Sequence, residues 1–427
     1  MTEPARAAEV PAPRPWVPAV AGAVAFLCMT AVAGAVAIVE WLAAGEPFGA
    51  RLTWKLAGLY VATFHGGGVD IRAGLRSGGT DAPPALAGVS TLHVTFLLGT
   101  ILAGGALWRA GRSVGRRTGA DGWRRMAWGA FIAPTYALLV FVVSLVIRLG
   151  LPTGGITDVR PVAWEAGLGA LLLAVGAGAA GAAATEPMGE RPGRLAAWLR
   201  GGWRMTVALV VLAFAGFLVV AGVRSDVSAA YVRGVSGSKA GVVAAVHHVL
   251  FLPDQSFLIA APAMGSCLRL SGSGSQPTTL CLRTLTIRPG FGQLVLPPDA
   301  SSAPVSLPVV WLLFLAVPAI ATVWGGLAAG AGAGSALEAA IRGAGSGLVF
   351  AAAVVVGEGV STIWITREPG GTILRLGADL VRTGTLACAW GIGGGVVGAL
   401  LASRRQEPAG PAAEEPPPAT PPSPTSV

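Results

Sequence analysis

Residues 17–43 read VPAVAGAVAFLCMTAVAGAVAIVEWLA and include a single acidic or basic side chain, Glu40. A helix that crosses the hydrocarbon core of a bilayer needs about 20 predominantly apolar residues. The stretch exceeds the ~7–15 residue core of a cleaved signal peptide, so we expect a retained signal anchor. Seven later stretches have the same character: Leu86–Trp108, Ala127–Leu149, Val162–Ala184, Met205–Val223, Leu307–Gly330, Gly347–Thr366 and Leu380–Ala402. The sequence therefore predicts an all-α bundle of eight transmembrane helices.

The composition of the whole chain points to the same class of protein. Of its 427 residues, 53% are hydrophobic and 12% are charged, and the mean hydropathy is +0.67. Because a typical soluble domain carries about 25% charged residues, this composition excludes a soluble globular or a disordered chain. The formal net charge of +9 does not indicate nucleic-acid binding, since the arginines lie between apolar runs rather than along one helix.

Basic residues are distributed unequally between the two sides of the predicted bundle. Arginines are concentrated in loops 109–126 and 186–204, whereas the short loops on the opposite side carry fewer. The positive-inside rule then places both termini in the cytoplasm, and we expect the plasma membrane as the location. An even number of spans agrees with two ends on one side.

The predicted organisation has five segments. These are a cytoplasmic tail (1–16), five spans (17–223), an external loop (224–306), three spans (307–402) and a disordered, Pro-rich cytoplasmic tail (403–427). Two external stretches, Leu52–Phe64 and Gly241–Met264, are partly apolar but interrupted, and we interpret them as amphipathic or re-entrant segments. If Gly241–Met264 crossed the bilayer, the count would be nine and one terminus would change sides.

The first four and the last four predicted spans follow the same plan. In each half a span leads to an external amphipathic stretch, a second span, a cytoplasmic loop, a third span, a short external loop and a fourth span. The short loops 152–160 and 369–375 read PTGGITDVR and PGGTILR. The sequence thus suggests a parallel 4+4 repeat. The alternative is a chance resemblance between turns rich in glycine and proline.

One acidic residue lies at the middle of a predicted span. Glu358 is flanked by Gly357 and Gly359, and a charge at this depth costs roughly 2.5–3.5 kcal/mol. His93 lies in the outer half of the second predicted span. One interpretation is a polar pathway open to the outside, with Glu358 at its floor. The other is a protonated Glu358 that hydrogen-bonds a neighbouring helix and only holds the bundle together.

The external loop contains Cys267 and Cys281. Outside the cytoplasm a disulfide between them is permitted, and closing so short a loop is worth roughly 3 kcal/mol in the chain-entropy model. The alternative is two unpaired thiols. Cys28 and Cys388 lie inside predicted spans, where they are expected to be small packing residues.

Three short motifs resemble enzyme signatures but lack the structural context that each requires. Gly176–Gly181 fits GxGxxG inside an apolar span with no preceding strand. Gly111–Gly115 fits GxSxG within an arginine-rich loop rather than a strand-to-helix turn. Gly234–Gly237 resembles the GxSG of rhomboid proteases but lies in the external loop, and His247 and His248 follow on the same loop. Neither a metal-binding nor a nucleotide-binding motif is present, so we expect no enzyme, cofactor or metal.

Two phrases resemble an uncharacterised family of polytopic membrane proteins from high-GC Gram-positive bacteria, the family that includes the cell-division membrane protein PerM. Residues 107–112 read LWRAGR, similar to that family's LxRAGRR after its second span. Residues 252–258 read LPDQSFL, similar to its external LLPNxxxW, although Asp254 stands where that pattern has Asn. The resemblance implies a multi-span fold without established catalysis, and it implies no functional residues.

Together these features favour a non-enzymatic scaffold or assembly factor of the cell envelope. Its expected partners are the lipid bilayer and other membrane proteins or a second copy of the chain, and not nucleic acid. The alternative is a small-solute or ion permease that uses the Glu358 region. A water path to Glu358 would favour the permease, and a dry, close-packed Glu358 would favour the scaffold.

The predicted topology can be tested with reporter fusions. Fusions after Arg117, Arg200 and Arg405 are expected to report a cytoplasmic location. Fusions near Gly155 and Ser273 are expected to report the outside, because the basic loops stay in the cytoplasm. A cytoplasmic signal at Ser273 would contradict the eight-span arrangement.

Overall fold

The computed structural model describes most of the chain except the two tails and several loops. The described residues are 14–44, 50–73, 88–118, 122–150, 156–185, 194–223, 246–247, 249–272, 278–281, 286–287, 305–306, 314–368 and 371–405. Most of the two predicted tails and much of the 224–306 loop, with the Gly234–Gly237 motif, therefore lie outside the described residues.

Helices make up most of the described chain, and many are continuous apolar segments. Those of the first half are α1 (Trp16–Ala44), α2 (Ala50–Thr63), α3 (Leu97–Thr118), α4 (Gly122–Ala130), α5 (Ala133–Val146) and α6 (Ala163–Ala183). Those of the second half are α7 (Arg194–Val223), α10 (Leu252–Ala263), α12 (Ala316–Gly330), α13 (Ala336–Ser361) and α14 (Leu380–Arg404).

Six helical stretches among the described residues are long and apolar enough to cross a membrane. They are Trp16–Leu42, Gly122–Val146, Ala163–Ala183, Arg194–Gly216, Ala336–Ser361 and Leu380–Arg404. The chain is thus a multi-pass membrane protein, and six of the predicted spans are confirmed by this measure. The other two, Leu86–Trp108 and Leu307–Gly330, correspond to α3 and α12. The second half of α3 is rich in arginine, and α12 has only 15 residues.

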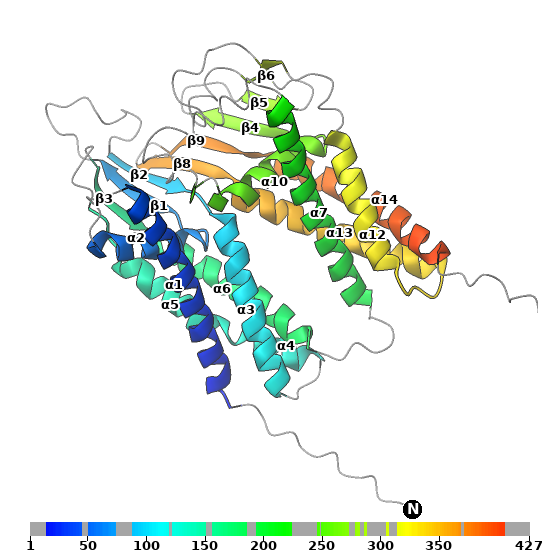
Figure 1. The fold of residues 1–427 in the computed structure, drawn as a ribbon, viewed down its shortest axis with the longest axis horizontal. Helices are drawn as coiled ribbons and strands as arrows, with labels where there is room; N and C mark the ends of the chain where they lie inside the picture. The colour runs from blue at the N-terminus through cyan, green and yellow to red at the C-terminus, as the bar shows by residue number, and fades with distance from the viewer. Residues whose placement is uncertain are drawn as a thin grey trace, which may run out of the picture.

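The helices form two groups that are joined at one end by a β-sheet (Figure 1). The sheet contains β1 (Val69–Ala73), β2 (Gly88–His93), β3 (Ile156–Pro161), β4 (Cys267–Gly272), β5 (Thr278–Cys281), β8 (Ile363–Glu368) and β9 (Gly371–Ala378). It has the order β3-β1-β2-β8-β9-β4-β5, and every pairing is antiparallel. A separate small pair is β6 (Thr286–Ile287) with β7 (Val305–Ser306).

The sheet corrects the all-α prediction. Leu86–Trp108 does not begin as a helix, because β2 occupies 88–93 before α3 starts at Leu97. Gly347–Thr366 likewise ends in β8, and the short external loops contain β3 and β9. A short run of apolar and β-branched residues fits a buried strand and a helix end equally well. The prediction from hydropathy therefore assigned the strands to the neighbouring membrane-spanning helices. The stretch Leu52–Phe64 largely coincides with α2, and part of 241–264 forms α10.

The outer ends of the two halves share the same backbone connection. Gly66 after α2 has φ +75° and Gly265 after α10 has φ +90°, values that favour glycine. A shift of 199 residues relates the two positions, and the same shift relates β1 to β4. Two pairs of backbone hydrogen bonds correspond in the same way. Gly67 N donates to Ala62 O at 3.1 Å, as Ser266 N donates to Ala261 O at 2.9 Å. Val162 N donates to Gly68 O at 2.7 Å, as Asp379 N donates to Cys267 O at 3.2 Å.

The helices of the two halves also pack through equivalent residues. Gly178 of α6 and Gly395 of α14 are related by a shift of 217, and each lies where two further helices approach at backbone contact. The corresponding contacts are Gly178 with Gly111 and Gly129, and Gly395 with Gly326 and Gly343. On the first helix of each half, Gly22 faces Ile132 and Thr135, and Gly202 faces Ser346 and Val349. A shift of 180 residues relates α1 to α7 and therefore Gly22 to Gly202. A shift of 214 residues relates α5 to α13 and therefore Ile132 and Thr135 to Ser346 and Val349.

The strand units of the two halves are arranged head to tail. The order β3-β1-β2 in the first half matches β9-β4-β5 in the second, and β8 lies between them. Leu149 forms a single bridge with Val159, the pair equivalent to Ile363 and Leu376 at the start of the β8–β9 hairpin.

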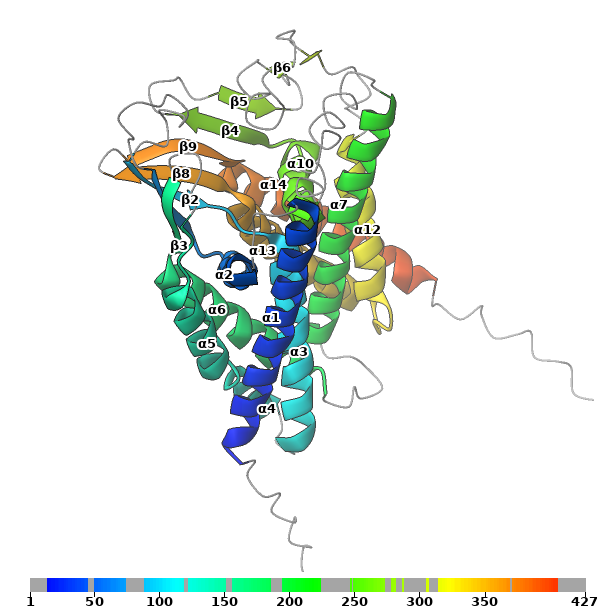
Figure 2. The same cartoon turned by 60° about the vertical axis from the view of Figure 1, so that its left-hand side comes forward.

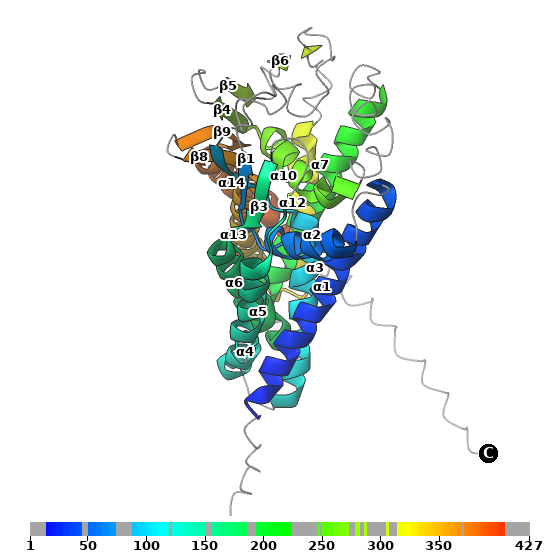
Figure 3. The ribbon, with the colours of Figure 1, turned by 90° about the vertical axis from the view of Figure 1, so that its left-hand side faces the viewer.

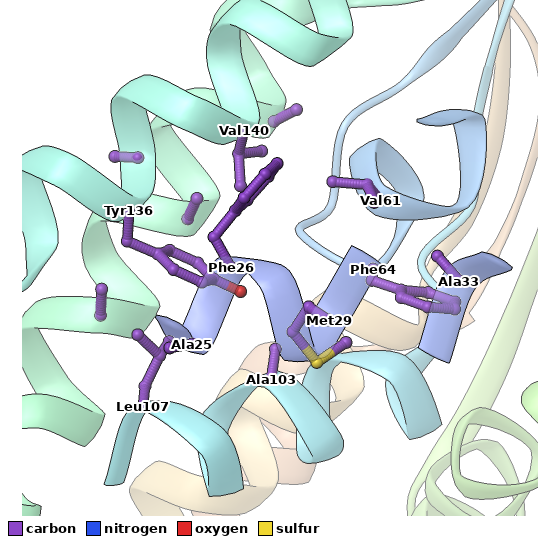
Figure 4. Close-up of a cluster of buried hydrophobic side chains, with 14 of the residues drawn as sticks. Ala25, Phe26, Met29, Ala33, Val61, Phe64, Ala103, Leu107, Tyr136 and Val140 are labelled. Carbon is purple, nitrogen blue, oxygen red and sulfur yellow. The ribbon is translucent and has the colours of Figure 1, made fainter. Parts of the chain in front are cut away.

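The largest core cluster lies in the first half, among α1, α2, α3 and α5 (Figure 4). Met29, Phe64, Leu107, Tyr136 and Val140 are almost completely buried there. In the second half the core between α7, α12, α13 and α14 includes Leu209 and Phe350 at the positions equivalent to Met29 and Tyr136. Figure 2 shows these helical groups from a second direction, with the sheet across the same end of both.

Adding a methyl group at the backbone crossings should loosen a helix pair. A Cβ at Gly178 would meet the backbone of Gly129, and a Cβ at Gly395 the backbone of Gly343. We expect Gly178→Ala and Gly395→Ala each to lower the free energy of unfolding by about 1–3 kcal/mol, the usual cost of overpacking. Gly176→Ala is the matched control, because nothing lies within 4 Å of a Cβ there. Thermal melting in detergent measures the difference, and equal melting temperatures for all three variants would contradict the packing.

Candidate functional site

Glu358 lies on α13 near the end of the bundle that carries the sheet. Its side chain is fully buried, and neither carboxyl oxygen has a close hydrogen-bond partner among the described residues. The backbone of Ala261 on α10 lies beside the carboxyl group, and Gly357 packs against the ring of Phe257 on the same helix. The residue lines neither the cavity formed by α1, α2 and α5 nor the arginine-lined groove on α3. Glu358 is thus close-packed between α13 and α10.

His93 is placed differently from its prediction. It is the last residue of β2 rather than part of a helix, and its ring stacks on Trp364 of β8 with centroids 4.7 Å apart. Its Nδ1 lies 3.3 Å from Oε2 of Glu165 on α6, which also accepts a hydrogen bond from Gly68 N at 2.8 Å. His93 therefore belongs to the joint between the halves, and no described interaction connects it with Glu358.

Asp254 is a second buried acid that hydropathy did not single out. It opens α10 and is completely buried. Its Oδ2 accepts a hydrogen bond from Leu97 N, at the start of α3, at 2.9 Å, whereas its Oδ1 has no partner among the described residues. Ser361 of α13 lies beside the carboxyl group. Burial raises the pKa of Asp254 to about 7. The acid therefore ties α10 to the opposite half while keeping one oxygen free.

A third polar group joins α1, α2 and the segment before α10. The Tyr60 hydroxyl donates to Oε1 of Glu40 and lies 2.8 Å from Nε2 of His247, which is also 2.8 Å from Glu40 Oε1. Phe96 packs against the rings of Tyr60 and His247. Burial and the Glu40 carboxyl raise the pKa of Tyr60 well above its ordinary value. Glu40 and His247 were visible as polar residues in apolar surroundings, but their pairing depends on the tertiary fold.

A buried histidine in the first half is structural. His65 Nδ1 donates to Val61 O at 2.6 Å, and the Tyr136 hydroxyl donates to its Nε2 at 2.8 Å. Burial lowers the pKa of His65 to about 4. The neutral ring satisfies both of its nitrogens, so it has no free position for a ligand.

The predicted cysteine pair lies in the sheet. Cys267 of β4 is disulfide-bonded, and Cys281 of β5 is its direct backbone partner in the ladder. This register is compatible with the predicted bridge, whose partner assignment stays a prediction. Cys28 and Cys388 are free.

The described part of the chain brings together no set of three metal-binding side chains. The two described motifs, Gly176–Gly181 and Gly111–Gly115, lie inside α6 and α3, away from any strand-to-helix turn. What the arrangement offers chemically is buried acids that can hold or release a proton. Comparison of the chain with protein-family models, curated proteins and solved structures found no match.

The raised pKa of Asp254 predicts a pH-dependent stability. The protonated form is favoured in the folded protein, so the free energy of unfolding should fall as pH rises from about 4 to about 7 and then level off. The loss should be on the order of a few kcal/mol. In Asp254→Asn this decline should shrink, because no proton is bound on folding. Melting temperatures between pH 4 and 8 measure it, and identical profiles for the two proteins would contradict the assignment.

Proposed function

We propose that this protein is a non-enzymatic scaffold or assembly factor of the plasma membrane, which presents its sheet to a partner in the cell envelope. The observation that carries the proposal is the unequal character of the two faces of the sheet. Val69, Ile71 and Val159 pack with Ile147 and other apolar residues against the helices. The side chains that alternate with them face away from this core.

The outward face is polar and rich in arginine. Asp70 accepts hydrogen bonds from Thr91 at 2.8 Å and from Arg160 at 3.2 Å, which fixes three strands in one polar network. Arg269 pairs with Asp379 at the start of α14. Arg375 lies opposite Trp364 in the ladder and is exposed. A surface of this kind fits an acidic partner surface, since complementary charge favours encounter and specificity.

Eight passes and two cytoplasmic ends complete the proposed topology. The chain alternates in direction through α1, α3, α5, α6, α7, α12, α13 and α14, which can be followed in Figure 1. On this view α3 and α12 also cross, shielded by their neighbours. Arg116, Arg194 and Arg404 lie at the helix ends opposite the sheet, which supports a cytoplasmic location for that end. The equivalent contacts in the two halves support a parallel 4+4 duplication.

The resemblance to the family that includes PerM supports the same functional class. The phrase 107–112 lies in α3 and the phrase 252–258 begins α10. The second segment contains Asp254, which accepts a hydrogen bond from Leu97 N at the start of α3.

A second candidate function is proton or cation permeation. It is favoured by Glu358, whose two buried oxygens lack partners, and by the free Oδ1 of Asp254. A buried polar group left unsatisfied costs about 1–3 kcal/mol, so its presence calls for an explanation. The complete burial of Glu358 supports the scaffold over the permease.

Complementation of cells that lack this protein separates the two functions. The scaffold predicts that Glu358→Gln restores growth and envelope integrity and that Arg375→Glu, which reverses the charge of the outward face, does not. The permease predicts the reverse, with proton flux in proteoliposomes abolished by Glu358→Gln. Equal melting temperatures establish that each variant is folded.

The stability of Glu358→Leu adds an independent measurement. Because the carboxyl group makes no hydrogen bond, we expect Leu to leave the melting temperature unchanged or to raise it. Ser144→Ala is the matched control at the equivalent position of α5, where the hydroxyl donates to Val140 O at 2.8 Å. A strong destabilisation by Leu would show that Glu358 has a hydrogen-bonded partner and holds the bundle together.

A further inference from the structure

An apolar groove lies between α1, α2 and α5. It has a volume of about 630 Å³, within the range of ~300–1,000 Å³ that is usual for small-ligand sites. Gly34 and Trp41 line it from α1, Trp54 and Gly58 from α2, and Val146 from α5. The three helices lie side by side in Figure 3, with α2 crossing near the outer end of α1.

Phenylalanine stands at the two positions of the second half that correspond to Gly34 and Gly58. The shift of 180 that relates α1 to α7 places Phe214 at the position of Gly34. The shift of 199 that relates α2 to α10 places Phe257, which is buried and packs against Gly357, at the position of Gly58. At Gly58 the side chain of Ile147 takes the place that a Cβ would occupy, whereas nothing lies within 4 Å of a Cβ at Gly34. The open space of the groove therefore lies beside Gly34.

The surroundings of the groove identify what can enter it. Ile38, Trp54 and Val146 on its walls are 48%, 49% and 64% exposed. Since α1 and α5 lie in membrane-spanning stretches, these apolar side chains meet hydrocarbon rather than water. Trp41 and Trp54 are residues of the kind that gather at the membrane interface. A water-soluble ligand has no route to this wall, whereas a lipid chain reaches it directly.

The groove also contains one polar atom without a partner. The Thr53 hydroxyl is buried and has no hydrogen-bond partner among the described residues. The groove wall shields this hydroxyl, and rotation of the Thr53 side chain would bring it to the groove surface. There it can donate to the ester carbonyl of a lipid, which lies at the junction of headgroup and acyl chain.

We propose that this groove is a binding site for one acyl chain of a membrane phospholipid, with the lipid ester beside Thr53. The site belongs to the first half of the molecule, where Gly34 leaves open space beside α1 and the corresponding residue of α7 is Phe214.

Photocrosslinking in proteoliposomes tests the site. The probe is phosphatidylglycerol with a diazirine in the middle of one acyl chain, and the crosslinked peptides are mapped by mass spectrometry. In the wild-type protein, labelling should concentrate on the groove-lining residues of α1, α2 and α5 and should saturate. Gly34→Phe should reduce it at least five-fold, because the new ring has open space to fill.

Gly176→Phe is the matched control. It adds the same ring to the spanning helix α6 at another site with nothing within 4 Å of the Cβ, and it should leave groove labelling unchanged. If Gly34→Phe does not fold, Val146→Trp fills the groove from the exposed side of α5 and should give the same loss. Labelling spread evenly over the lipid-facing helices, or unchanged in both folded filling variants, would overturn the proposal.

Discussion

The antiparallel pairing of β2 with β8 joins the two halves of this protein, and their relative placement depends on it. Each helical group packs within itself through close backbone contacts, whereas the contact between the groups is concentrated at the outer end, in this strand pair and where α10 meets α3. In lipid, apolar helices gain little hydrophobic energy by associating, so directed hydrogen bonds carry more of the specificity. The stacking of His93 on Trp364 and the hydrogen bond from Leu97 N to Asp254 reinforce the same joint.

Hydropathy predicted the features that depend on the bilayer alone. The extent of α1 and the position of five further membrane-spanning stretches follow from how the bilayer sorts side chains. The sheet was missed because its strands continue directly from apolar helices. In β8 the sequence Ile363–Glu368 offers bulky and β-branched residues next to an apolar helix, and only the partner strands distinguish the two conformations. Glycines at corresponding places of the predicted repeat, such as Gly178 and Gly395, lie at close helix crossings in both groups of helices.

The polar residues show the limit of sequence reasoning more clearly. The position of Glu358 in an apolar run was predictable, but its lack of a partner is a property of the packed neighbours. His93 was assigned to a membrane helix, whereas it stacks at the end of a strand, since a register assignment requires knowledge of the pairing. Asp254 and the Glu40–Tyr60–His247 group depend on contacts between residues far apart in the chain. A single sequence without these contacts could identify the candidates but not the groups they form.

The head-to-tail order of the strand units gives the molecule a direction along the sheet. Two strand units related by a two-fold axis would place the same strand at both edges of the sheet. Here one edge is formed by β3 and the other by β5, as in a heterologous assembly. Such a series can in principle be extended by further units. A further unit would pair with β5 at one edge and would lie beside β3 and the Leu149–Val159 bridge at the other, so the two edges offer different partners.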